Sequence, residues 1–367
     1  MVETTAAVVR GAGEPFEIET VELDGPSDGE VLVDVTAVGL CHTDLTVQAG
    51  DQPTELPAVL GHEGAGVVED VGEGVDSVEP GDHVVLSFDS DGTCKHCHEG
   101  RPAYCETIIP TNFGSGRPDG SSTISLDGED IGGRFFGQSS FAEKAIVSER
   151  SLVPVDDDAP LELLGPLGCG VQTGAGGVIN SLSPSAGDDI VVFGAGSVGL
   201  SGVLGAQLCG CGEIVAVDVV ESRLERAESL GATATVNSEE VDDVAAALRE
   251  HLGGGVPYAL ETTGVPAVLE TAIDSLGNLG TVGVIGAPPL GERASFDVNE
   301  LLAGRTIRGI TEGDSVPQEF IPDLVDLHEQ GRFPFDEFVT FYDFEDINDA
   351  VADVEDGDVI KPILRLE

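Results

Sequence analysis

The sequence predicts an α/β protein, with a doubly wound parallel sheet in one domain and a second domain that is rich in β-strands. Short apolar strands alternate with helical stretches between residues 189 and 285, which is the pattern of a parallel sheet covered by helices. Before residue 150, apolar residues recur at alternate positions among many glycines, as in closely packed strands. A chain of 367 residues is long enough for two domains. The predicted spans are 1–170 for the β-rich domain, 171–305 for the α/β domain and 306–367 for a return to the first.

Three strand-like segments and one loop are predicted in the β-rich domain. Residues 30–37 carry valines at alternate positions, residues 61–72 mix glycines with valines, and residues 81–85 indicate a turn into a strand. Residues 111–137 are rich in Gly, Ser and Asp, so we expect a long surface loop there.

The α/β domain opens with a glycine-rich turn between a strand, residues 189–193, and a helical stretch that extends to Leu208. In such a turn the first glycine permits the bend, the second lets the backbone approach a pyrophosphate, and the third lets the helix pack on the sheet. The helix N-terminus also favours phosphate groups. The predicted cofactor contacts in the turn are Gly194, Gly196, Ser197, Val198 and Gly199.

An acidic residue at the end of the next strand completes a Rossmann dinucleotide fingerprint. Asp218 follows Gly194 by 24 residues, which is close to the usual interval of about 20. Its carboxylate is expected to bind the ribose hydroxyls and to repel a 2′-phosphate, and this favours NAD over NADP. Arg223 is a candidate adenine contact, with a solvated helix residue as the equal alternative. The alternative for the whole motif is a packing turn that binds no nucleotide.

One acid and three cysteines with close spacing form a candidate structural metal site. Such a set can wrap a tetrahedral zinc and close a loop, and it leaves no coordination position open. His96 and His98 lie between the cysteines as alternative ligands, and free thiols beside a surface acid are the alternative to a metal site. The predicted ligands are Asp91, Cys94, Cys97 and Cys105.

A second candidate set is spread along the chain and comprises Cys41, His62, Glu63 and Cys169. Two thiolates and one imidazole leave a fourth zinc position open for water or substrate. Each of these residues is ordinary by itself, because a buried Cys or a lone His is usually structural. Their spacing alone does not bring them together.

Taken together, these motifs closely resemble those of the zinc-containing medium-chain alcohol dehydrogenases, in the order of that family and over essentially the whole chain. The resemblance implies a GroES-like fold for the β-rich domain. It assigns Cys41, His62 and Cys169 to a catalytic zinc and makes Glu63 the nearby acid that can enter its coordination.

The resemblance also implies roles around these ligands. Thr43 matches the residue that starts a proton relay, and Asp44 matches the acid that orients the zinc-bound imidazole. His42 and Lys361 match positions near the cofactor pyrophosphate, and Thr173 matches a nicotinamide contact.

Two positions depart from the family pattern. Asp91 stands where the family has Cys, so we expect zinc to bind more weakly there or to be absent. Thr46 stands where some members have a relay His, so the last proton step is expected to go directly to water.

Within the family, residues 86–88, 313–317, 331–335 and 360–365 resemble the aryl-alcohol (benzyl alcohol) dehydrogenases in particular. This implies reversible, NAD-dependent oxidation of a primary aromatic alcohol to its aldehyde, with Phe88 in the substrate pocket. Short aliphatic alcohols or a polyol are alternative substrates. Two further alternatives are a zinc-free reductase of the same superfamily and a non-enzymatic protein that binds NAD or stores zinc.

The charge balance is extreme, with 68 Asp and Glu against 16 Lys and Arg and a formal net charge of -52. Such a surface repels itself at low salt, and roughly 1 M salt shortens the Debye length to about 3 Å. We therefore expect a protein of a high-salt cytoplasm; an acidic protein with a basic partner is the alternative. The negative charge disfavours nucleic acids and anionic membranes as partners. The sequence shows no apolar signal core at its N-terminus and no apolar run of spanning length, which also favours the cytoplasm.

The chain has seven cysteines, and in a reducing compartment their clusters indicate metal ligands rather than disulfides. We also expect a homodimer or homotetramer. The strand over residues 280–286 is a candidate for pairing across a two-fold axis, and an edge strand that pairs only within the chain is the equal alternative.

Overall fold

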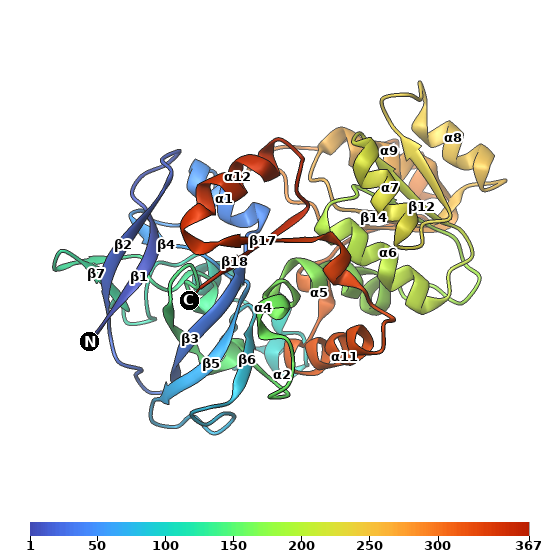
Figure 1. Cartoon of the computed structure of the whole chain (residues 1–367). Coiled ribbons are helices and arrows are strands. Elements are labelled where there is room, and N and C mark those ends of the chain that lie inside the picture. Colours follow the sequence, from blue (N-terminus) through green and yellow to red (C-terminus); the bar gives the residue numbers. More distant parts are fainter. Residues whose placement is uncertain (367) are drawn as a thin grey trace. The chain divides into compact units, whose positions relative to one another are not determined.

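The N-terminal part of the chain forms two sheets in a computed structural model, which describes residues 1–366 (Figure 1). The strand β3 (Glu30–Gly39) lies inside a seven-stranded sheet, where it pairs with β5, β9 and β18. Its residues Val31, Val33 and Val35 point into one apolar cluster, as the period of two predicts.

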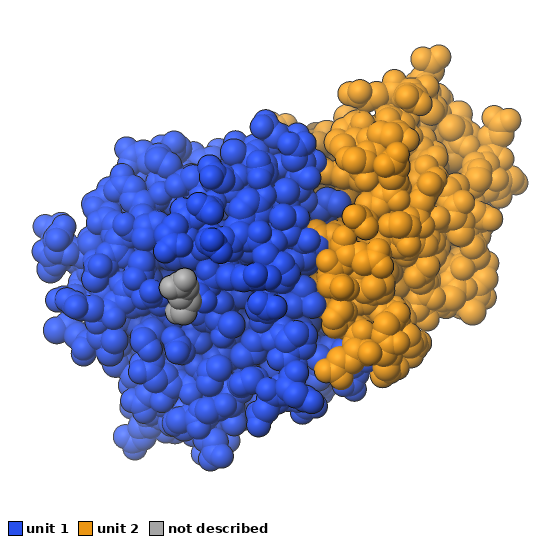
Figure 2. Space-filling view, viewed as in Figure 1, with its two compact units in different colours: residues 1–169, 316–326, 339–367 blue, residues 170–315, 327–338 orange. Residues whose placement is uncertain are grey.

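Both sheets of this part of the chain belong to one unit, formed by residues 1–169, 316–326 and 339–367 (Figure 2). The seven-stranded sheet has the order β10-β6-β5-β3-β18-β17, with β9 on β3, and the five-stranded sheet has the order β4-β1-β2-β7-β8. The strands of the unit are β1 (Val2–Val9), β2 (Phe16–Leu23), β3 (Glu30–Gly39), β4 (Ala58–Val59), β5 (Gly64–Val71), β6 (His83–Leu86), β7 (Ile124–Leu126), β8 (Glu129–Ile131), β9 (Lys144–Ser148), β10 (Leu152–Val155), β17 (Val339–Asp343) and β18 (Lys361–Arg365).

The second unit, residues 170–315 and 327–338, holds a six-stranded parallel sheet. Its order is β13-β12-β11-β14-β15-β16, which is the Rossmann arrangement in which strand order reverses beside the first strand. The strands are β11 (Ile190–Phe193), β12 (Ile214–Asp218), β13 (Ala234–Asn237), β14 (Val256–Glu261), β15 (Leu276–Val284) and β16 (Thr306–Gly309).

Both faces of this parallel sheet are buried at its central strand β11, which explains why that strand is apolar throughout. In β11, Ile190 and Val192 face one cluster, whereas Val191 and Phe193 face the other. The first cluster includes residues of α6, and the second includes residues of α8 and α9. The predicted doubly wound sheet is therefore confirmed.

The helices connect the strands and mostly lie on the sheets. Within residues 1–366, none has the length and apolarity that crossing a membrane requires. The α-helices are α1 (His42–Ala49), α2 (Lys95–His98), α3 (Ile108–Asn112), α4 (Leu161–Leu164), α5 (Gly170–Gly176), α6 (Ser197–Cys209), α7 (Glu221–Ser229), α8 (Val244–His251), α9 (Pro266–Ser275), α10 (Val298–Leu301), α11 (Pro317–Glu329) and α12 (Ile347–Glu355). Single turns of other helix types are η1 (Pro102–Tyr104), η2 (Phe135–Gly137), η3 (Glu149–Ser151), η4 (Gly165–Gly168), η5 (Gly177–Leu182), η6 (Glu312–Asp314), η7 (Phe335–Phe338) and η8 (Phe344–Asp346).

Two expectations need correction. The predicted surface loop over residues 111–137 contains β7 and β8 and ends in the buried side chains of Phe135 and Phe136. The strand proposed for pairing across a two-fold axis is β15, and within the chain it already pairs with β14 on one side and β16 on the other. The strand is therefore not an edge strand; the edge of the sheet on this side is β16.

Candidate active site

The structure brings Cys41, His62, Glu63 and Cys169 together, although the sequence separates them by up to 128 residues (169 minus 41). One ligand atom from each residue lies within 4.8 Å of those of the others. Cys41 is the N-cap of α1, His62 and Glu63 directly precede β5, and Cys169 follows η4. The arrangement is that of a metal site.

His62 is held as a metal-binding imidazole is held. Its ring is fully buried, and Nδ1 lies 3.0 Å from Oδ1 of Asp44. The other ring nitrogen, Nε2, is buried and has no hydrogen-bond partner among the described residues. A buried nitrogen left without a partner costs about 1–3 kcal/mol, and a metal ion at Nε2 removes that cost. A carboxylate on the far nitrogen is the usual support of a histidine ligand.

Asp44 fixes three points of the chain around this imidazole. Besides His62, its carboxylate accepts hydrogen bonds from the backbone N–H of Gly61, at 3.1 Å, and of Cys41, at 3.0 Å. The bond to Cys41 is half of a capping box that starts α1. The predicted orienting role of Asp44 therefore has a structural basis that also includes the first thiol ligand.

The electrostatics of the cluster favour a thiolate beside a cation. A hydrogen bond from Cys169, together with the charges of Lys361 and His62, outweighs burial and holds the pKa of Cys41 well below its ordinary value. Burial alone lowers the pKa of His62, but the carboxylate of Asp44 and the thiol of Cys41 raise it well above its usual range. Two sulfur donors and one nitrogen donor are the ligand set that suits zinc.

Glu63 and Lys361 form a buried ion pair beside the ligands. Nζ of Lys361 donates to both carboxylate oxygens of Glu63, at 2.8 and 3.0 Å, and to the carbonyl of Leu40 at 3.1 Å. Burial raises the pKa of Glu63, and the ammonium of Lys361 opposes that rise. Loss of one partner from such a pair costs about 3–5 kcal/mol. Sequence reasoning missed this pairing; the pyrophosphate contact expected of Lys361 stays a prediction, as does that of the exposed His42.

The two threonines of α1 differ in their surroundings. The hydroxyl of Thr43 lies 3.8 Å from Sγ of Cys41, next to the cluster, which is compatible with the relay role expected of it. The hydroxyl of Thr46 donates to the carbonyl of Thr43 at 2.9 Å. The hydroxyl of Thr46 is therefore bonded within its own helix, which fits the expectation that the proton relay does not pass through Thr46.

Aromatic side chains cover the imidazole, and the sequence analysis did not identify them. The ring of Phe136 lies 4.5 Å from that of His62, and the ring of Phe135 lies 5.4 Å from it. Phe113 packs edge-on against both phenylalanines. Phe88, the predicted pocket residue, is 3% exposed within the apolar core of the same unit, and its contact with substrate stays a prediction. The adjacent aromatic pair inside a polar segment was the signal available in the sequence.

The four predicted ligands of the structural site also gather within 4.8 Å of one another, and neither His96 nor His98 belongs to the group. Sγ of Cys94 lies 3.5 Å from Sγ of Cys97 and 4.0 Å from Sγ of Cys105.

Hydrogen bonds within this lobe hold Asp91 in place. Its Oδ1 accepts the backbone N–H of Cys94 at 2.8 Å and of Thr93 at 2.6 Å, where α2 begins. These bonds hold the pKa of Asp91 well below its ordinary value. The hydroxyl of Thr107 lies 3.2 Å from Oδ2. One oxygen therefore holds the turn that precedes α2, and the carboxylate lies among the three thiols, where it can serve as a ligand.

The glycine-rich turn of the second unit shows which glycines the protein itself requires. Gly194 has a φ of 93°, and a Cβ there would lie 2.6 Å from Oγ1 of Thr262. A Cβ at Gly199 would lie 1.7 Å from the carbonyl of Gly194, whereas one at Gly196 would meet nothing within 4 Å. The space beside Gly196, at the N-cap of α6, fits the pyrophosphate expected there.

Asp218 sits at the carboxyl end of β12 and is bonded to the same turn. Its Oδ2 accepts the N–H of Ala195 at 2.6 Å, and its Oδ1 accepts those of Val219 and Val220. Arg223 lies in α7 with its Nε buried and without a partner among the described residues. These placements fit the predicted ribose and adenine contacts.

Thr173 lies in α5, where its hydroxyl donates to Glu312 at 3.2 Å. Its nicotinamide contact stays a prediction.

Two models of protein families match this chain. The model of the alcohol dehydrogenase GroES-like domain matches residues 27–157, and that of the zinc-binding dehydrogenase matches residues 197–330. A geraniol dehydrogenase of Castellaniella defragrans is 45% identical over 99% of this chain and 98% of its own.

Two solved structures also match. An alcohol dehydrogenase zinc-binding domain protein from Burkholderia ambifaria has a TM-score of 0.98 at 56% identity, covering 100% of this chain and 99% of its own. The benzyl alcohol dehydrogenase of Acinetobacter calcoaceticus has a TM-score of 0.97 at 47% identity, with 100% of both chains covered. The β-rich unit therefore has the expected GroES-like fold.

Proposed function

Since the chain belongs to the zinc-containing medium-chain alcohol dehydrogenase family, we propose that it oxidises a primary aromatic alcohol of the benzyl type to its aldehyde, reversibly and with NAD. The observation that carries this proposal is the cluster of Cys41, His62 and Cys169, in which a buried imidazole nitrogen has no hydrogen-bond partner within residues 1–366. Three protein ligands leave a fourth position for substrate.

The residues of the chain position and deprotonate the alcohol. When bound, zinc supplies a Lewis acid that lowers the pKa of an alcohol oxygen, and the nicotinamide accepts the hydride. Asp44 keeps the imidazole of His62 turned towards the metal, and the thiolates of Cys41 and Cys169 offset the metal charge. The hydroxyl of Thr43, beside Cys41, takes up the alcohol proton as it passes its own proton on towards water.

The choice of NAD rests on Asp218. A carboxylate fixed by three backbone N–H groups at the end of β12 accepts hydrogen bonds from ribose hydroxyls and repels a 2′-phosphate. We expect Asp218→Ala to weaken NAD binding and to narrow the preference over NADP. An unchanged ratio of kcat/KM for the two cofactors would refute this role.

The aromatic substrate is supported by the phenylalanines packed around His62 and by the benzyl alcohol dehydrogenase among the similar structures. Rates of NADH formation with benzyl alcohol, ethanol and a polyol test this point. A preference for benzyl alcohol is expected. Activity on ethanol alone would be compatible with the zinc chemistry but would refute the proposal of an aromatic substrate. Activity on the polyol alone would favour a polyol as the substrate.

We further propose that the enzyme functions at high salt and as a homo-oligomer. The formal net charge of -52 produces strong self-repulsion, which salt screens as the Debye length falls from about 10 Å at 0.1 M to about 3 Å at 1 M. We expect the midpoint of thermal unfolding to rise with KCl concentration and light scattering to give a dimer or tetramer. A midpoint independent of salt, or a monomer, would contradict the respective proposal.

A further inference from the structure

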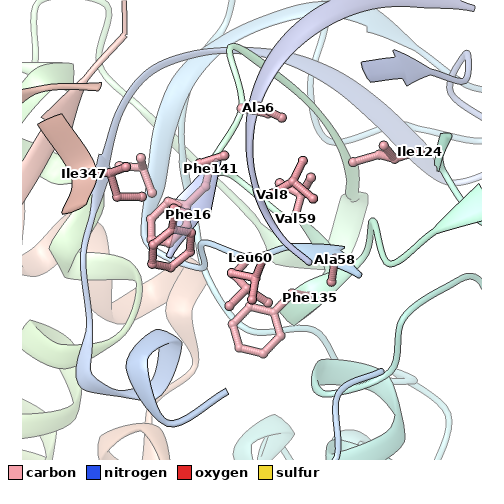
Figure 3. Packing of buried hydrophobic residues seen from close by; sticks show 14 of the residues in the cluster. Ala6, Val8, Phe16, Ala58, Val59, Leu60, Ile124, Phe135, Phe141 and Ile347 are labelled. Carbon is pink, nitrogen blue, oxygen red and sulfur yellow. The ribbon is translucent and has the colours of Figure 1, made fainter. Parts of the chain in front are cut away.

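Residues 135–141 run along the segment that carries His62 and are bonded to four consecutive carbonyls of it. We call this stretch the histidine clamp. Figure 3 shows Leu60 beside Phe135 in the apolar cluster that both segments share. The four bonds are Ser139 Oγ to Val59 O (2.7 Å), Phe141 N to Leu60 O (3.0 Å), Ser140 N to Gly61 O (3.0 Å) and Gln138 Nε2 to His62 O (3.0 Å).

Gln138 is the member of the clamp whose side chain does most of the bonding. It is fully buried, and its Nε2 also donates to the carbonyl of Ser87 at 3.1 Å. Its Oε1 accepts the N–H of Gly64 at 3.3 Å and the hydroxyl of Ser140 at 2.8 Å. Two donors and two acceptors saturate a side-chain amide, so this residue can occupy its place in one orientation only.

The same network continues to the other end of the ligand set. The hydroxyl of Ser87, also fully buried, donates to the carbonyl of Gly168 at 2.7 Å, and Cys169 is the next residue. A Cβ at Gly168 would lie 1.9 Å from the carbonyl of Leu86, so the backbone before Cys169 packs against the end of β6 with no room to spare. A chain of buried hydrogen bonds thus joins the backbone of one ligand to that of another.

The backbone of the clamp is strained where it meets the imidazole. Phe136 and Ser139 have φ values of 52°, in the left-handed region that residues with a Cβ rarely adopt. Such residues persist where their surroundings over-determine them, and they gather at functional sites. Phe136 uses this conformation to lay its ring over His62, with an angle of 31° between the two planes.

From these observations we infer that the histidine clamp is a positioning device, in which Gln138 and Ser87 set the separation of His62 and Cys169. Neither residue touches substrate in this role. The inference rests on the zinc site proposed above. A metal fixes its donor atoms within a few tenths of an ångström, so a shift of either backbone weakens the site or distorts its coordination.

The test compares Gln138→Met and Ser87→Ala with the wild-type enzyme. The methionine keeps the volume of the glutamine and removes both its donors and its acceptor oxygen, and the alanine removes the hydroxyl that donates to Gly168. Zinc loss to a chelator is followed in time, and the visible absorption of cobalt-substituted protein reports coordination geometry. Val33→Ala, in the core of the same unit at 0% exposure, is the control for a loss of stability alone.

For Gln138→Met we expect zinc affinity to fall by about 10- to 100-fold, the range for partners just outside a metal site. The cobalt spectrum shifts and kcat falls more than KM changes. Ser87→Ala shows the same changes at smaller size, and Val33→Ala shows only a lower unfolding temperature. If Gln138→Met and Ser87→Ala retain zinc and the cobalt spectrum as Val33→Ala does, the clamp is merely structural. Failure of the wild-type protein to hold catalytic zinc would instead overturn the proposed function.

Discussion

Asp44→Asn is the substitution whose effect the geometry defines most closely. The carboxylate accepts one hydrogen bond at Oδ2, from the N–H of Cys41, and two at Oδ1, from Gly61 and His62. An asparagine oxygen can keep the two bonds at Oδ1, but its NH₂ group then faces the N–H of Cys41. That N–H loses its acceptor, which costs about 1–3 kcal/mol of folding free energy.

The charge of Asp44 also supports the metal through the imidazole of His62. Loss of such a partner lowers metal affinity by about 10- to 100-fold, which is about 1.4–2.8 kcal/mol at about 1.4 kcal/mol per tenfold. We therefore expect Asp44→Asn to destabilise the metal-free fold by about 1–3 kcal/mol and the zinc-bound fold by more, since the second effect adds to the first.

Urea unfolding of metal-free and zinc-bound protein separates the two effects, and transfer of zinc to a chromophoric chelator measures the second directly. Asp243→Asn is the matched control, because Asp243 caps α8 through the N–H of Ala246 at 2.8 Å and asparagine is an equally good cap. An Asp44→Asn protein that keeps zinc as well as the Asp243→Asn protein would refute the role assigned to Asp44.

The remaining predictions concern other parts of the molecule. Gly196→Ala should fold normally and weaken NAD binding, whereas Gly199→Ala should lower the unfolding temperature; calorimetry and NAD titration distinguish the two, and equal behaviour would contradict the assignment. Asp91→Ala should remove any zinc that the lobe holds, which elemental analysis measures, and a wild type with two ions per chain whose content is unchanged in the variant would show that Asp91 is no ligand. Burial alone raises the pKa of Glu30, but hydrogen bonding to Arg117 holds that pKa below its ordinary 4.5. The ionised Glu30 therefore stabilises the fold above about pH 4.5, and this contribution is lost as acid protonates Glu30 in the folded protein. Glu30→Gln should therefore unfold at lower urea concentration at neutral pH, with the difference closing in acid; a difference that persists in acid would contradict this.

The parts of the fold that the sequence predicted well depend on local patterns. The parallel sheet follows from apolar strands bounded by helices, and the turn at Gly194 combines a strand, spaced glycines and Asp218 within 30 residues (189 to 218 inclusive). The lobe around Cys97 is similarly local. In each case neighbouring residues carry the whole signal, so no knowledge of how distant segments meet is needed.

The rest depended on contacts between distant segments. Cys41 and Cys169 could be joined only through the resemblance to a family, because no spacing rule links them. The pairing of Glu63 with Lys361 spans 298 residues and shows in neither local sequence. The histidine clamp was hidden by its composition, because the Gly, Ser and Asp before it indicate a surface loop, whereas buried carbonyls of the His62 segment give its polar side chains their partners.

The central claim is that a zinc ion held by Cys41, His62 and Cys169 carries turnover of an alcohol with NAD. The most direct test measures NADH formation from benzyl alcohol in multimolar KCl for the wild-type enzyme and for Cys169→Ser, with the zinc content of each determined beside it. The account predicts turnover in the wild type and loss of both the catalytic zinc and turnover in the variant. Turnover close to that of the wild type in a Cys169→Ser protein that lacks this zinc would contradict it.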